Sequence, residues 1–129
     1  VIARTDARGV DGYDAAVSRA HAYLKAGADG VFPEALQSTE EFARFAKDVP
    51  TLLLANMTEF GKTPYLTADE FGAMGYRLVI YPVTLQRVAM KAVGESLRLL
   101  KKERSQRSQV DRMQTRDELY DLLGYKPTA

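Results

Sequence analysis

The chain has 129 residues, of which 46% are hydrophobic and 27% are charged, and its formal net charge is +1 at pH 7. These values are typical of one ordered globular domain, and they exclude a strong electrostatic field for nucleic acid or an anionic membrane as partner. The chain has no cysteine and no apolar run near the roughly 20 residues of a membrane span, which excludes disulfides and thiol catalysis by its own residues; we expect a cytoplasmic location.

The first predicted strand and helix lie at the start of the chain. Val1–Ala3 is an apolar run that leads into a charged segment, which indicates a short strand. Because the sequence opens directly in this strand, without an initiator methionine, we expect a segment of a longer protein. A loop is expected over Gly9–Gly12. The helical spacing of apolar residues then predicts a helix over Tyr13–Ala26, which Gly27 ends.

Two further strands are predicted in the next 30 residues. Gly30–Glu34 is the second candidate strand. Ser38 and Glu41 have the spacing of a capping box, which predicts the start of a helix that ends near residue 47. Thr51–Ala55 is an apolar run, and such runs are typical of strands buried on both faces of a parallel sheet.

A loop, a short helix and a fourth strand follow. The Thr58–Leu66 loop is long for a connection between a strand and a helix, so we expect it to act as a lid or gate. Thr67 and Glu70 repeat the capping-box spacing, and the helix they start is expected to end at Gly75. Arg77–Tyr81 is the fourth candidate strand.

The last part of the chain is predicted to be helical. A long helix is expected over Thr84–Lys102, with an apolar face buried through Met90, Val93, Leu97 and Leu100. Arg104–Arg112 is polar and lacks apolar periodicity, which indicates an exposed linker. A final short helix is expected to begin over Met113–Tyr120 and to stop at Gly124.

The alternation of strands and helices predicts the fold. Four strand–helix units in sequence indicate an α/β protein with a parallel sheet and right-handed crossovers. Four such units are half of a (β/α)8 barrel, which typically needs about 250 residues. We therefore expect a half-barrel domain over residues 1–102 and a linker with a short helix over residues 103–129.

Polar side chains follow each predicted strand, and parallel strands end at one common edge. Arg4, Glu34, Asn56, Thr58 and Arg87 are therefore expected to lie near one another. Two guanidinium groups at one small opening suit a substrate with two or three carboxylates, because each can bind a carboxylate through two hydrogen bonds. An alternative for Arg4 is a purely structural ion pair with Asp6 or Glu34.

Five motifs carry a resemblance to a known family: ARTDA, FPEA, LANMTEFGKTP, YPVTLQR and MQTRDELYDLLGY. Together they resemble the isocitrate lyase and phosphoenolpyruvate mutase superfamily, in particular its branch that cleaves 2-methylisocitrate. The resemblance implies a (β/α)8 barrel that uses Mg²⁺ to form pyruvate and succinate in propionate catabolism, through the methylcitrate cycle. It also implies substrate contacts by Arg4, Glu34, Asn56, Met57, Thr58, Arg87 and Arg116, with Glu34 as the catalytic candidate among them.

The resemblance further implies what this sequence lacks. The family's catalytic cysteine and its magnesium-binding aspartates belong to an upstream half, so no metal ligand is assigned here and the chain alone is expected to be inactive. The family also implies a homo-oligomer with helix exchange, with a tetramer as one form. The alternatives are another superfamily activity, namely isocitrate lyase, oxaloacetate decarboxylase or phosphonate mutase, and a non-catalytic half-barrel module.

Overall fold

The computed structural model describes residues 1–126 of the chain. Contacts between residues divide the chain into two compact units, Val1–Gln86 and Arg87–Ala129. The first unit holds the sheet and its helices, and the second is helical. The domain boundary near residue 102 stays a prediction.

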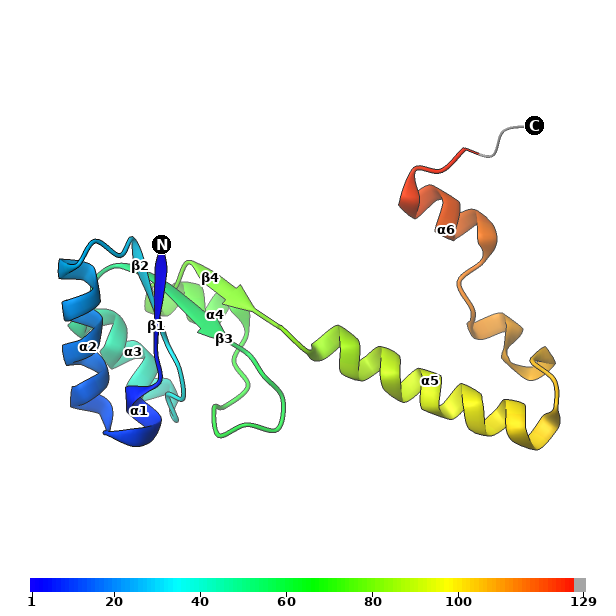
Figure 1. Cartoon of the computed structure of the whole chain (residues 1–129), viewed down its shortest axis with the longest axis horizontal. Helices are drawn as coiled ribbons and strands as arrows, with labels where there is room; N and C mark the ends of the chain where they lie inside the picture. The colour runs from blue at the N-terminus through cyan, green and yellow to red at the C-terminus, as the bar shows by residue number, and fades with distance from the viewer. Residues whose placement is uncertain (127–129) are drawn as a thin grey trace. The chain divides into compact units, whose positions relative to one another are not determined.

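The first unit is built on one sheet of four parallel strands, which confirms the predicted α/β class (Figure 1). The spatial order of the strands is their order in the chain. Their bounds are Ile2–Thr5 for β1, Gly30–Pro33 for β2, Leu52–Asn56 for β3 and Leu78–Ile80 for β4. Parallel neighbours in this order are the arrangement of consecutive strands in half of a (β/α)8 barrel.

Helices fill the connections between the strands. They are α1 (Ala7–Val10), α2 (Tyr13–Lys25), α3 (Thr39–Asp48) and α4 (Ala68–Met74). The expected loop over Gly9–Gly12 is wrong, because α1 occupies its first two residues. A helix of four residues is too short to show an apolar period, so the sequence pattern does not reveal it.

The two predicted capping boxes form to different extents. The Ser38 hydroxyl accepts from the Glu41 N–H at 3.2 Å, as expected, but the Glu41 carboxylate bonds to Arg8 and to the Gln37 N–H. At α4 both halves of the capping box form between Thr67 and Glu70. The first box is thus half formed, because an arginine from another element binds its carboxylate.

The core of the first unit lies between the sheet and the helices. α2 and α3 lie side by side, where Tyr13 contacts Phe45 edge to face (Figure 1). A second aromatic cluster joins Phe42, Phe71 and Tyr76, with ring centroids 5.0 to 5.6 Å apart. Phe45 is fully buried. Replacing a buried phenylalanine with alanine costs roughly 3–5 kcal/mol of stability.

The opposite face of the sheet is only partly covered within the first unit. β2 is buried along its whole length, but β3 alternates, with Leu53 and Ala55 buried and Leu52 38% exposed. On β4, Leu78 and Ile80 are 41% and 37% exposed. The expectation that the third strand is buried on both faces is therefore not met within the first unit, because the helices of that unit cover only one face of β3.

The long helix α5 (Thr84–Glu103) carries no buried residue. Its predicted apolar face exists, but the side chains of that face are 40–60% exposed: Met90, Val93, Leu97 and Leu100. No element of the second unit buries them, so the predicted burial is not met within that unit. Helical spacing identifies an apolar face, whereas burial also requires a surface that covers it.

The segment after α5 is more ordered than an exposed linker. Arg107–Arg112 forms the 3-10 helix η1, in which Gln109 is only 4% exposed. The Ser96 hydroxyl donates to the Gln109 side-chain oxygen, which joins α5 to η1. This contact buries an amide instead of an apolar side chain, so apolar periodicity does not predict it.

The final helix α6 spans Arg116–Leu123 and begins with a complete capping box between Thr115 and Glu118. It ends at Gly124, whose φ of 61° is left-handed, as the predicted stop signal requires. No helix in residues 1–126 combines the length and apolar character needed to cross a membrane.

Candidate active site

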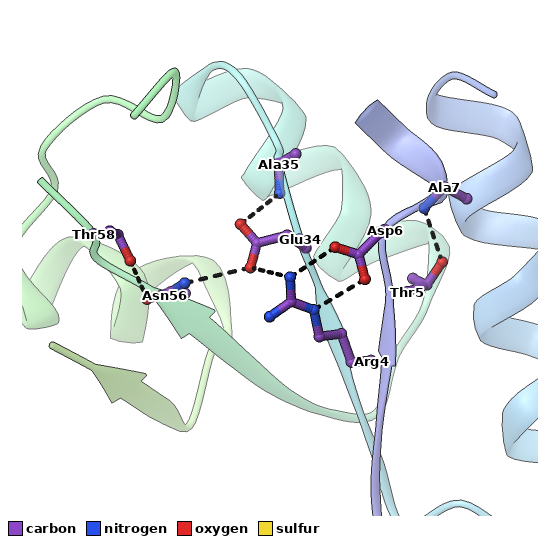
Figure 2. Close-up of polar contacts among 8 residues, drawn as sticks. All are labelled: Arg4, Thr5, Asp6, Ala7, Glu34, Ala35, Asn56 and Thr58. Carbon is purple, nitrogen blue, oxygen red and sulfur yellow. Dashed lines mark hydrogen bonds and ion pairs between the residues drawn. The ribbon is translucent and has the colours of Figure 1, made fainter. Parts of the chain in front are cut away.

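The sheet brings the ends of three strands together at one edge. The parallel register places Arg4 beside Phe32 on the neighbouring strand, and the Glu34 N–H continues the ladder to the Thr5 carbonyl at 2.9 Å. Asn56 is the last residue of β3. Figure 2 shows the side chains of Arg4, Glu34 and Asn56 pointing toward one another from these strand ends. Within the first unit, Arg4, Glu34 and Asn56 therefore lie together, as the predicted convergence requires of them.

A continuous chain of polar contacts links the predicted residues (Figure 2). The Thr58 hydroxyl donates to the Asn56 side-chain oxygen at 2.8 Å, and the Asn56 amide nitrogen donates to Glu34 Oε2 at 3.3 Å. Arg4 Nη2 lies 3.5 Å from the same carboxylate oxygen. These contacts fix the orientation of the Asn56 amide, because its oxygen and nitrogen have different partners.

Asp6 also binds Arg4, although it is not among the predicted site residues. Its carboxylate accepts from Arg4 Nε at 3.0 Å and from Nη2 at 2.7 Å. The hydrogen bonds that Arg4 donates to Asp6 raise the pKa of Arg4 and lower the pKa of Asp6. The guanidinium also lies over the Phe32 ring, 5.0 Å from its centroid. The alternative ion pairs named for Arg4 are thus both present.

The paired guanidinium keeps capacity for a ligand. Its contacts with Asp6 and Glu34 use Nε and Nη2, whereas Nη1 has no hydrogen-bond partner within residues 1–126. The Arg4 side chain is 52% exposed. An exposed guanidinium edge held in place by two carboxylates is suited to bind an incoming carboxylate, because its orientation is fixed before the ligand arrives.

Met57 lies on the other side of the sheet from these polar side chains. It is 5% exposed and belongs to the hydrophobic core, and its N–H donates to the Ile80 carbonyl at 2.8 Å. Alternation along the strand explains this position, since neighbours in a strand point to opposite faces. Its substrate contact stays a prediction, and its structural position is that of a core residue beside the site.

Arg87 and Arg116 belong to the second unit. Arg87 lies in the first turn of α5, as predicted, and Arg116 is the first residue of α6. Each is described within that unit only. Their contacts with substrate stay predictions.

The loop after β3 is fixed by side-chain contacts. The Thr63 hydroxyl donates to the Leu36 carbonyl at 2.9 Å, and the Phe60 N–H donates to the Tyr65 hydroxyl at 2.9 Å. The Thr84 hydroxyl donates to the Glu59 carboxylate. A cavity of about 210 Å³ lies beside the loop, lined by Met57, Glu59, Tyr65, Leu66, Tyr81 and Thr84. Motion of this loop as a lid stays a prediction.

The described residues do not form a metal site on their own. Within residues 1–126 no group of three or more histidine, aspartate or glutamate side chains is placed to hold an ion. At the strand ends, the carboxylates of Asp6 and Glu34 both interact with Arg4. Because Mg²⁺ prefers six oxygen ligands in octahedral geometry, this donor set does not fit the ion without further ligands.

The chain is similar to known proteins over nearly all of its length. The family model described as phosphoenolpyruvate phosphomutase matches residues 1–101. A curated protein named 2-methylisocitrate lyase from Bacillus subtilis (strain 168) is 57% identical over 125 residues, which cover 97% of this chain and 42% of that protein. The chain therefore spans less than half the length of this relative.

Solved structures show the same similarity. The crystal structure of 2,3-dimethylmalate lyase, described as a member of the PEP mutase/isocitrate lyase superfamily, matches with a TM-score of 0.86 and 35% identity, over 95% of this chain and 43% of that one. A phosphonopyruvate hydrolase in complex with oxalate and Mg²⁺ matches with a TM-score of 0.80 and 27% identity, over 96% and 44% of the two chains.

Proposed function

The chain belongs to the phosphoenolpyruvate phosphomutase family, and we propose that the complete protein carrying it cleaves 2-methylisocitrate into pyruvate and succinate. The observation that carries this proposal is the cluster of Arg4, Glu34, Asn56 and Thr58 at one edge of a parallel sheet. That edge is where α/β proteins bind ligands. The 57% identity to a protein named for this reaction supports the choice of substrate.

In the proposed reaction, the substrate hydroxyl loses its proton and the carbon–carbon bond breaks. The hydroxyl carbon becomes the carbonyl of pyruvate, and the bonding electron pair stays on the succinate side until that carbon receives a proton. Arg4 binds a substrate carboxylate through its open Nη1 edge. Asn56, Thr58 and Arg87 hold the carboxylates of the succinate-forming part, where negative charge develops.

Glu34 is the catalytic candidate of this chain. Its Oε2 contacts both Arg4 and Asn56, so it is the one carboxylate within residues 1–126 that links the cationic and the amide donors. We assign it the task of orienting these donors and the polar groups of the bound substrate. Arg116 is assigned a substrate contact from the second unit.

We propose that the reaction uses Mg²⁺, although residues 1–126 do not form its site on their own. The carboxylates at the strand ends are held by Arg4, so we propose that the ion takes its ligands mainly outside residues 1–126. We also propose a cytoplasmic homo-oligomer that exchanges helices, with a tetramer as one form. The exposed apolar side chains of α5 support this assignment, since an exchanged helix needs such a face.

A substrate panel tests the function. The complete protein is incubated with Mg²⁺ and racemic 2-methylisocitrate, and pyruvate is measured through lactate dehydrogenase and NADH. Isocitrate, oxaloacetate, phosphonopyruvate and 2,3-dimethylmalate are assayed in parallel for their own products. We expect the highest kcat/KM with 2-methylisocitrate and no turnover by the 129-residue chain alone. A higher kcat/KM with another member of the panel would assign that activity instead, and no turnover at all would favour a non-catalytic module.

A further inference from the structure

We propose that Thr63, together with the Arg8–Glu41 ion pair, positions Glu34 by holding in place the turn that follows Glu34. This inference rests on the proposed function, since it assigns the turn a task in the same site. The turn covers residues 35–38 and joins β2 to α3.

The direct contacts of Glu34 are long. Its carboxylate accepts from the Ala35 N–H at 3.2 Å and from the Asn56 amide at 3.3 Å, and it lies 3.5 Å from Arg4. Hydrogen bonds of this kind are most often about 2.9 Å long. The position of the carboxylate therefore depends strongly on the backbone that carries it.

That backbone adopts an unfavourable conformation. Ala35 has a φ of 64°, in the left-handed region that residues other than glycine rarely occupy. Such a residue persists when the surrounding contacts hold it in place. The turn therefore needs anchors outside itself, and the structure provides them.

The first anchor comes from the loop after β3. The Thr63 hydroxyl donates to the Leu36 carbonyl at 2.9 Å, and Leu36 is fully buried. The contact joins two residues 27 positions apart in the chain. It ties the loop that begins beside Thr58 to the turn that begins beside Glu34.

The second anchor comes from α1, which follows β1. Arg8 donates to the Glu41 carboxylate from Nε at 3.0 and 3.1 Å and from Nη2 at 2.6 Å. The same carboxylate accepts from the Gln37 N–H at 2.9 Å. The Arg8 and Glu41 side chains are only 20% and 23% exposed, so solvent screens this pair less than a surface pair.

The turn is thus held from both neighbouring strand ends, by α1 on one side and by the β3 loop on the other. All three anchoring contacts lie outside the polar cluster of Arg4, Glu34 and Asn56, so none of their side chains is required to touch substrate. This arrangement makes Thr63, Arg8 and Glu41 positioning residues, which act through Glu34.

Thr63 offers a matched pair of variants for the test. In the complete protein, Thr63→Val removes the hydroxyl and keeps the shape, whereas Thr63→Ser keeps the hydroxyl. We expect kcat for 2-methylisocitrate to fall roughly three- to tenfold in Thr63→Val, the range for the loss of one hydrogen bond. Thr63→Ser should stay within about twofold of the unmodified protein, on the same scale.

A double-mutant cycle separates positioning from general stability. In a Glu34→Gln background, Thr63→Val should cause less than about a twofold further loss, because two residues that act as one unit are not additive. Glu41→Gln gives an independent variant, which keeps an acceptor for Gln37 but removes the charge that binds Arg8. Glu41→Gln should also lower kcat, and it should cause little further loss when Glu34→Gln is already present.

A spectroscopic measurement tests the positioning role without an activity assay. The side-chain amide resonance of Asn56, which reports the Glu34 contact, should shift in Thr63→Val and stay in place in Thr63→Ser. The positioning role is overturned if the resonance does not change, or if Thr63→Val lowers kcat by the same factor with and without Glu34→Gln. If the unmodified protein does not turn over the substrate while the resonance shifts as expected, the proposed function fails and the positioning role stands.

Discussion

Gly30 provides a sharp prediction, because the space for one extra carbon can be read directly from the structure. A Cβ at Gly30 would lie 2.6 Å from the Leu52 carbonyl oxygen and 2.8 Å from Leu52 Cδ2. Gly30 pairs with Leu52 in the ladder between β2 and β3, so the backbone contact cannot be relieved by rotating a side chain. Gly30→Ala therefore forces the two central strands of the sheet apart.

The expected cost follows from two contributions. Overpacking a close contact costs about 1–3 kcal/mol, and a strained ladder hydrogen bond adds about 1 kcal/mol, so the free energy of unfolding should fall by roughly 2–4 kcal/mol. The matched control is Gly72→Ala in α4, where an added Cβ meets nothing within 4 Å. Alanine in a helix is favoured over glycine by up to about 1 kcal/mol, so this variant should be slightly more stable.

Urea unfolding of the complete protein, followed by far-UV circular dichroism, measures both variants. Gly30→Ala should lower the unfolding midpoint, and Gly72→Ala should leave it unchanged or raise it. The reasoning is refuted if Gly30→Ala unfolds at the midpoint of the unmodified protein, or if both substitutions lower the midpoint equally. The second result would mean that any added methyl group disturbs this unit, whatever its surroundings.

Three further predictions concern charges and caps. In the complete protein, the proposed function predicts that Arg4→Ala lowers kcat/KM for 2-methylisocitrate by roughly a hundredfold, through the loss of two charge-assisted hydrogen bonds. Arg19→Ala, whose Asp11 ion pair is similarly exposed, should leave kcat/KM unchanged, and equal losses would contradict the role of Arg4. The hydrogen bonds from Arg8 lower the pKa of Glu41 below its ordinary value of 4.5, so the stability from this pair is complete above about pH 4.5 and is lost as the pH falls through the folded-state pKa. The free energy of unfolding should therefore fall less steeply with acid in Glu41→Gln than in the unmodified protein, and identical curves would refute this. Thr67→Ala should lower the stability by about 1 kcal/mol because it removes the α4 cap, whereas Thr67→Ser keeps the capping hydroxyl and should keep the stability. Thermal unfolding measures both variants, and equal melting temperatures would argue against the cap.

The sequence predicts the strands and their common edge well, because these depend on local patterns. A strand–helix repeat places Arg4, Glu34 and Asn56 at neighbouring strand ends whatever the details of packing. Thr67 and Gly75 likewise mark the two ends of α4 through local hydrogen bonding and a left-handed φ of 101°. These features require only residues close in sequence.

The contacts that the sequence does not reveal join residues far apart in the chain. Glu41 has the spacing of a capping residue, yet its carboxylate binds Arg8, 33 positions away. Thr63 lies in a loop without periodicity and bonds to Leu36. The burial expected for Leu97 on α5 is not met within the second unit for a related reason, since an apolar face shows that a helix can pack but not what covers it. Tertiary partners of this kind have no local signature.

The open sheet has a practical consequence for work on the 129-residue chain by itself. Within residues 1–126, β1 and β4 each pair with one neighbour only, so both margins offer backbone donors and acceptors to a further strand. The bare apolar side chains Leu52, Leu78 and Ile80 lie on the same sheet. A solution of the isolated polypeptide should therefore self-associate as its concentration rises, which light scattering over a dilution series would reveal.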